Sequence, residues 1–170
     1  MMIGITGTPG TGKSTVAQEL RARGHVVTAL STTITPYIIE RDEARDTLVI
    51  DEESWAREFP GVEGFVEGHL AHLLSCDLIV VMRCRPDVLA IRLRARGYSD
   101  AKVSENVEAE ALDIALVETL EEFRGDQILE IDTTERDFVE CARLIEEFSQ
   151  GKISPSFGNI DWSGYLGEAV

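Results

Sequence analysis

Short apolar runs alternate along the chain with longer stretches in which apolar residues recur at helical spacing. Runs rich in β-branched and other apolar residues predict five strands, at residues 2–6, 25–30, 64–66, 77–82 and 127–131. Helical spacing predicts helices over residues 13–23, from Pro86 to about residue 93, from 102 to 123 and from 138 to 148. Strands that alternate with helices favour a parallel sheet with helices on both faces. We therefore expect one α/β domain over residues 1–149.

Two segments do not fit this alternation. Residues 31–60 are polar and rich in charge and threonine, and they lie between the second and third expected strands, where an acceptor-binding lobe could be inserted. The tail at 150–170 is rich in glycine and serine but carries Phe157, Trp162 and Tyr165. Because a disordered tail seldom carries so many aromatic side chains, we expect it to dock on the domain or on a partner.

Length and composition narrow the class of protein. A chain of 170 residues can bury a sizeable core without disulfides. No apolar run approaches the roughly 18 residues that a membrane span needs, and no basic leader precedes a long apolar stretch, so we expect neither a span nor a signal peptide. The three cysteines are odd in number and lack metal-type spacing. They indicate reduced, mostly buried thiols and a cytoplasmic protein.

The chain is strongly acidic, with 31 acidic against 16 basic residues and a net charge of −15. Such a surface repels nucleic-acid phosphates, so we expect no direct DNA binding; it favours basic partners or serves solubility alone. A local exception is a group of five arginines within fourteen residues, at positions 83, 85, 92, 94 and 96. Phosphate binding is one reason to keep them there.

Residues 7–15 carry the clearest chemical signal. They read Gly-Thr-Pro-Gly-Thr-Gly-Lys-Ser-Thr, which matches G-x-x-x-x-G-K-[ST] between an apolar strand and an amphipathic helix. In such a loop the backbone N–H groups and the helix N-terminus face phosphate oxygens. Lys13 is expected to reach the β- and γ-phosphates, and the Ser14 hydroxyl to ligate magnesium. The motif predicts a phosphotransferase that binds a nucleoside triphosphate with Mg²⁺.

A second phosphate-handling group is expected at the end of a neighbouring strand. The third expected strand ends in Glu67-Gly68-His69. Glu67 is the candidate for a carboxylate on the magnesium side, and His69 for a residue that orients water or substrate near the γ-phosphate. A hydrogen-bonded histidine without a catalytic role is an equal alternative for His69. His72 is expected to pack or to lie at the surface.

Together with Arg96-Gly97-Tyr98 and the run Glu105-Asn106-Val107-Glu108-Ala109-Glu110, these segments resemble the small adenylate kinases shared by archaea and the eukaryotic nucleus. The eukaryotic members are called adenylate kinase isoenzyme six or coilin-interacting nuclear ATPase. The resemblance covers about residues 1–148. It implies a nucleoside monophosphate kinase fold with a five-stranded parallel sheet, a monophosphate-binding lobe near 31–53 and a short lid near 96–106. It also implies ATP hydrolysis and a role in small ribosomal subunit maturation, through a ribosomal protein of the platform.

The resemblance also implies roles for single residues. The triphosphate contacts become Gly10, Gly12, Lys13, Ser14 and Thr15, and Arg96 becomes a lid arginine that closes over ATP. A guanidinium fork also suits phosphate oxygens on chemical grounds, and Arg92 either supports Arg96 or is a solvated helix arginine.

Two features depart from the family pattern. Many members have Asp where this chain has Glu67, which leaves open whether this carboxylate contacts magnesium directly or through water. The usual Gly-Asp-Leu-Ala-Arg run of the lobe is also missing. Arg41 and Arg45 are therefore candidates to bind the acceptor phosphate, but neither belongs to a recognisable motif.

Three functions remain in view. The first is transfer of the γ-phosphoryl group of ATP to AMP or another nucleoside monophosphate. The second is an ATP-hydrolysing assembly factor for a basic ribosomal protein, with incidental kinase activity. The third is a P-loop kinase for a small metabolite such as shikimate, which is weakened because residues 31–48 contain no Asp-x-Asp pair and the third strand lacks a triple-glycine acceptor motif.

Overall fold

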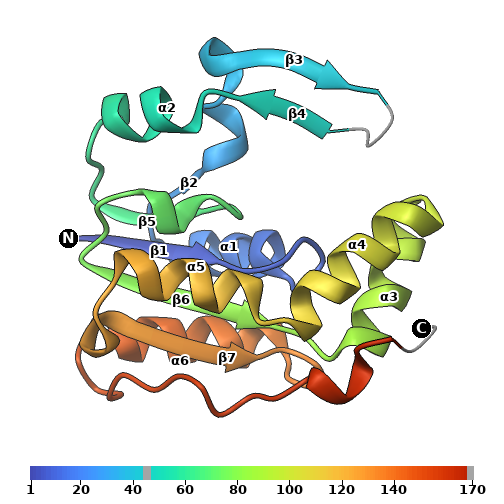
Figure 1. Cartoon of the computed structure of the whole chain (residues 1–170). Coiled ribbons are helices and arrows are strands. Elements are labelled where there is room, and N and C mark those ends of the chain that lie inside the picture. The colour runs from blue at the N-terminus through green and yellow to red at the C-terminus, as the bar shows by residue number, and fades with distance from the viewer. Residues whose placement is uncertain (44–46, 168–170) are drawn as a thin grey trace.

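The computed structural model describes residues 1–43 and 47–167, and it is built around one parallel sheet (Figure 1). The sheet has five strands in the order β2-β5-β1-β6-β7, and every neighbouring pair is parallel. The strands are β1 (Met2–Thr6), β2 (Val27–Ala29), β5 (Gly64–Glu67), β6 (Leu78–Arg83) and β7 (Ile128–Asp132). The expected α/β fold with a five-stranded parallel sheet is thus confirmed.

Helices cover both faces of the sheet, as the alternating pattern predicted. The helices are α1 (Lys13–Ala22), α2 (Glu52–Glu58), α3 (Pro86–Ala95), α4 (Asp100–Ala111), α5 (Ile114–Glu122) and α6 (Phe138–Ser149). One core forms where sheet residues such as Ile5 meet Val16 of α1 and Ile145 of α6. A second forms on the opposite face, where sheet residues meet Trp55 of α2 and Leu116 of α5. Helices α3 and α4 share a third, smaller core beyond the carboxyl ends of the strands.

The expected single helix over 102–123 is wrong in one respect, because the chain breaks it into α4 and α5. Asp113 adopts a left-handed backbone with φ of 57°, which a right-handed helix cannot contain. Its carboxylate is ion-paired with the guanidinium of Arg83. The break is therefore accompanied by a contact between residues far apart in sequence. The apolar periodicity of the sequence does not reveal such a contact.

The polar segment that follows β2 forms a separate lobe above the sheet (Figure 1). It contains the antiparallel hairpin of β3 (Ile38–Asp42) and β4 (Thr47–Ile50), followed by α2. Single 3₁₀ turns complete the chain at η1 (Leu30–Thr32), η2 (Thr35–Tyr37), η3 (Ala71–Leu73), η4 (Gly125–Gln127) and η5 (Ser163–Tyr165).

The tail lies along the edge strand β7, so it docks on the domain. Ser156 donates its N–H to the Ile128 carbonyl at 3.0 Å and accepts from Glu130 N–H at 2.8 Å. Farther on, η5 lies against α4, and the Trp162 and Tyr165 rings meet edge to face. The tail thus joins the open edge of the sheet to the α3–α4 region.

The structure can be compared directly with two expectations drawn from composition. Cys76, Cys84 and Cys141 are buried free thiols. Among the residues that the structure describes, no helix is long and apolar enough to cross a membrane.

Candidate active site

The glycine-rich loop between β1 and α1 is closely packed against the core. Gly7 has φ of 135°, and a Cβ there would lie 2.3 Å from the Met82 carbonyl oxygen. Gly12 has φ of 101°, and a Cβ would lie 2.2 Å from the Phe138 ring. Only glycine fits at these positions. Helix α1 begins directly after Gly12 with no side-chain cap and no acidic residue in its first turn, which leaves its N-terminus suited to an anion.

Lys13 lies inside the curve of this loop. Its Nζ donates to the Gly7 carbonyl at 2.5 Å and to the Thr8 carbonyl at 3.0 Å. Burial lowers the pKa of the Lys13 amine to about 8, although the carboxylates of Glu67 and Glu110 raise it. The positive charge of Arg96 lowers it further. The loop therefore holds a buried amine whose charge depends on the carboxylates around it.

Groups suited to a metal-bound phosphate stand beside the loop. Ser14 and Thr15 are exposed at the start of α1. Glu67 is buried at the end of β5, where it is paired with Ile5 in the neighbouring strand β1. No cluster of three or more His, Cys, Asp or Glu side chains suited to a metal occurs within residues 1–43 and 47–167. A magnesium ion here would be held chiefly by phosphate oxygens, with Ser14 and Glu67 as the protein groups that fit it.

The two histidines after β5 differ in their surroundings. His69 is an exposed residue in the turn after β5, where desolvation by its neighbours, together with the charges of Lys13 and His72, lowers the pKa of its imidazole to about 4. A neutral ring can accept a proton or a hydrogen bond from a substrate. His72 is buried; its Nδ1 contacts the His69 carbonyl, and its Nε2 lies 3.6 Å from Glu118. The expectation that His72 packs agrees with this placement.

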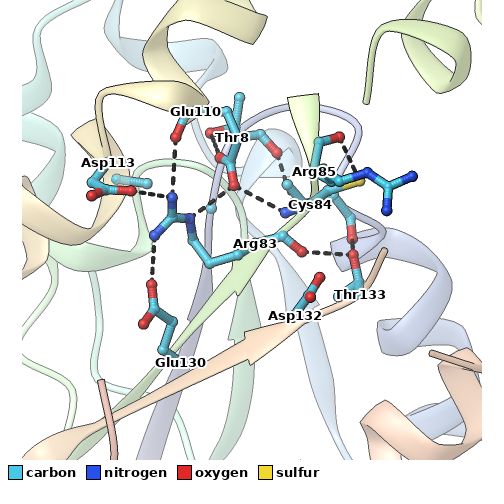
Figure 2. Close-up of polar contacts among 12 residues, drawn as sticks. Thr8, Arg83, Cys84, Arg85, Glu110, Asp113, Glu130, Asp132 and Thr133 are labelled. Atoms are coloured by element: carbon cyan, nitrogen blue, oxygen red, sulfur yellow. Dashed lines mark hydrogen bonds and ion pairs between the residues drawn. The ribbon is translucent and has the colours of Figure 1, made fainter. Parts of the chain in front are cut away.

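The five arginines between positions 83 and 96 separate into different environments. Arg83 is fully buried among carboxylates and cannot serve a phosphate (Figure 2). Arg92 is half-buried rather than a solvated helix arginine: it donates to the carbonyls of Thr133 and Thr134 at 2.8 and 3.3 Å and lies over the Phe138 ring. Arg96 is exposed at the end of α3, near enough to Lys13 to lower the pKa of its amine. Arg92 also lies near the loop, because Thr133, to which it donates, in turn donates to the Thr11 carbonyl.

A cavity of about 290 Å³ opens between the loop and the lobe. The P-loop contributes Gly7, Thr8 and Pro9 to its wall, and α2 contributes Glu52. The opposite wall comes from the turn after β5 and from α4 and α5. Its polar members are His69, His72, Asn106 and Glu118. Of the two lobe arginines expected to hold the acceptor phosphate, Arg41 is exposed on β3, and Arg45 lies outside the described residues.

Sequence reasoning missed several polar groups around the loop. Glu52, Asn106 and Glu118 line the cavity, and Glu110 lies buried beside Thr8. A usable signal existed for Glu110, because it continues the apolar spacing of Val103 and Val107 and therefore falls on the buried face of α4. A carboxylate at such a position needs partners, which the sequence alone does not identify.

The sheet order, the glycine loop and the helices define a P-loop kinase fold. Shikimate kinase from Acinetobacter baumannii in complex with shikimate aligns with a TM-score of 0.62 at 15% identity, over 88% of this chain and 93% of that one. Deoxyadenosine kinase from M. mycoides with products dCMP and dCDP aligns with a TM-score of 0.59 at 15% identity, over 89% of this chain and 99% of that one. At such low identity these likenesses concern the fold alone.

Sequence comparison identifies the family. Residues 3–113 match the family described as AAA domain. A protein of Archaeoglobus fulgidus named "Putative adenylate kinase" is 43% identical over 176 residues, which cover 100% of this chain and 96% of that protein. The chain belongs to this adenylate kinase-like family of P-loop proteins, and it is a kinase-like enzyme.

Proposed function

We propose that this protein transfers the γ-phosphoryl group of MgATP to a nucleoside monophosphate, with AMP as the first candidate. The observation that carries this proposal is the position of the cavity, which shares Gly7, Thr8 and Pro9 with the P-loop. A molecule in the cavity would lie next to a phosphate held by the loop. In-line transfer requires such an arrangement of donor and acceptor.

The donor side is proposed to consist of the P-loop and the lid. The backbone N–H groups of the P-loop, including those of Gly10 and Gly12, would face the phosphates. The positive charge of Lys13 would offset the negative charge of the phosphates. Ser14 and Glu67 would hold magnesium, and the hydroxyl of Thr15 is a further phosphate contact. Arg96, on the short lid near 96–106, would close over the transferring group, where its charge is needed most. Bound magnesium supplies charge neutralisation between phosphate oxygens.

The chemistry of the cavity fits the nucleoside part of an acceptor. Its volume is close to the lower end of small-molecule sites, about 300 Å³. Glu52 and Glu118 are unsuited to a phosphate, but they can accept hydrogen bonds from ribose hydroxyls or an exocyclic amine. Asn106 and a neutral His69 can both donate and accept. The acceptor phosphate would then lie toward the P-loop, and the lobe near 31–53 would close on the nucleoside.

A coupled assay for ADP tests this proposal. MgATP is supplied with AMP, with each other common nucleoside monophosphate, with shikimate, or with no acceptor. We expect ADP release to rise strongly with at least one monophosphate and to stay at the hydrolysis rate with shikimate. Stimulation by shikimate alone would favour the metabolite kinase, and no stimulation by any acceptor would leave an ATPase.

A second candidate function is an ATP-hydrolysing factor that binds a basic ribosomal protein of the small-subunit platform and takes part in subunit maturation in the cytoplasm. Two observations favour it: the net charge of −15, and an α5 surface where exposed Val117 and Leu120 stand beside Glu118 and Glu121. Such a surface suits a partner with basic and apolar side chains. ATP binding or hydrolysis would release the partner through a difference in affinity between two states.

A pull-down of the platform protein at low and high salt, with and without nucleotide, tests the second candidate. We expect binding at low salt that weakens at high salt, because the contact would rest on exposed charges. The amount bound should also change with nucleotide. Absence of binding at low salt, or indifference to nucleotide, would leave a kinase without this partner.

A further inference from the structure

The run Glu105-Asn106-Val107-Glu108-Ala109-Glu110 on α4 supplies a buried carboxylate that the proposed reaction does not use. Glu105 and Glu108 are exposed, and Asn106 lines the cavity. Glu110 is 1% exposed, although it is charged. Since burying a carboxylate is costly unless it is hydrogen-bonded, its partners indicate what it does.

Glu110 joins three parts of the molecule (Figure 2). Its Oε1 accepts from Arg83 Nε at 2.8 Å and from Cys84 N–H at 2.9 Å, both at the end of β6. Its Oε2 accepts from the Thr8 hydroxyl, in the second position of the P-loop. The side chain itself comes from α4, which follows the Arg96 turn. One carboxylate therefore links the P-loop, the sheet and the helix of the proposed lid.

The need to neutralise the charge of Arg83 does not by itself explain why the Glu110 carboxylate is buried here. The Arg83 guanidinium already pairs with Asp113 and, at 2.5 Å, with Glu130. Glu130 is in turn held by the Gly158 N–H of the docked tail at 2.8 Å. Arg83 thus has two further carboxylate partners, while Glu110 Oε2 accepts from the Thr8 hydroxyl of the P-loop.

We propose that Glu110 is a positioning residue for phosphoryl transfer, whose buried carboxylate fixes Thr8 of the P-loop to the lid helix α4. This inference rests on the proposed function above. Through this link, α4 and Thr8, whose carbonyl accepts from Lys13, keep a fixed relation when the lid closes. The preformed P-loop and the closed lid are thereby held together in the transfer geometry.

The test uses the full chain with Thr8→Val, Glu110→Gln and their combination. Glu108→Gln is the matched control, since it removes one charge from an exposed position of the same helix. We expect Thr8→Val and Glu110→Gln each to lower kcat per folded molecule about tenfold, with KM for MgATP changed less than about threefold. The double variant should be no slower than Glu110→Gln, because both changes break one link.

A readout without turnover separates this inference from the proposed function. Adding a non-hydrolysable MgATP analogue should protect α4 amides from hydrogen exchange in the wild-type chain and in Glu108→Gln, and much less in Thr8→Val. A wild-type chain that transfers no phosphate but shows this pattern refutes the proposed function and keeps the link. The inference is overturned if wild-type α4 gains no protection. It is also overturned if Thr8→Val keeps wild-type kcat and protection, or if the two substitutions are additive.

Discussion

The two sides of the candidate site differ in how the fold holds them. Most of the P-loop up to Lys13 is buried: Lys13 bonds to carbonyls of the loop itself, Thr8 bonds to Glu110 of α4, and Gly7 packs against β6 too closely to admit a side chain. The hairpin of the lobe instead leaves apolar side chains exposed on both strands, at Ile38, Ile39, Leu48 and Val49. Segments with few buried contacts open and close at low cost, whereas closely packed ones do not. The difference teaches that the donor side is preformed, while acceptor selection depends on an exposed lobe.

The largest effect is expected from Lys13→Ala. If the donor side serves every reaction of this protein, transfer to a monophosphate and hydrolysis without acceptor should both fall by about three orders of magnitude or more. Both rates are measured as ADP release, with the fold checked by circular dichroism. Lys152→Ala, in the exposed tail, is the control and should leave both rates unchanged. A folded Lys13→Ala variant within about tenfold of wild type would contradict the assignment.

The next effect concerns Arg96→Ala. We expect kcat to fall about a hundredfold while the affinity for ATP changes little, because the guanidinium is needed most when charge develops on the transferring group. Steady-state kinetics and equilibrium binding of a fluorescent ATP analogue measure the two quantities separately. Arg94→Ala is the matched control, since this neighbouring arginine is exposed and lies 3.8 Å from Asp100. Equal losses in affinity and turnover would assign Arg96 to ground-state binding.

The parts of the molecule that sequence reasoning predicted are those set by local signals. The glycines of the P-loop, the apolar runs of the five strands and the spacing of α6 each act within a few residues, and the structure contains all of these elements. The position of Glu67 at a strand end beside β1 follows from the same logic, because parallel strands carry their carboxyl ends to one edge.

The features that could not be predicted from the sequence depend mainly on contacts between residues far apart in the chain. The break between α4 and α5 involves Asp113 and Arg83, which lie 30 residues apart. The interpretation of residues 83–96 as a possible phosphate-binding group failed for Arg83, because its carboxylate partners come from later segments. The lobe hairpin was not predicted either, since its strands, Ile-Ile-Glu-Arg-Asp and Thr-Leu-Val-Ile, lack the alternation of apolar and polar residues that marks a half-buried strand.

A smaller effect is expected from Glu67→Gln and His69→Ala, which lie where the donor and acceptor sides meet. Glu67→Gln should raise the magnesium concentration needed for half-maximal rate, and His69→Ala should chiefly reduce hydrolysis without acceptor, each about tenfold. Magnesium titrations and acceptor-free ADP release measure these effects. Glu63→Gln, at an exposed position just before β5, is the control. Wild-type kinetics in both variants would return Glu67 and His69 to structural roles.

The smallest effect is expected on the acceptor side, from Arg41→Ala. If this arginine of the hairpin meets the acceptor phosphate when the lobe closes, its loss should raise KM for the monophosphate about fivefold to tenfold, as expected for one exposed charged contact. KM for MgATP and the hydrolysis rate should not change, because the P-loop is held independently of the hairpin. Arg57→Ala on α2 is the matched control, since Arg57 is also an exposed arginine of the lobe and lies 3.7 Å from Glu53. A change in hydrolysis without acceptor in Arg41→Ala would show that the lobe acts on the donor side, and the contrast between a preformed P-loop and a separate acceptor lobe would fail.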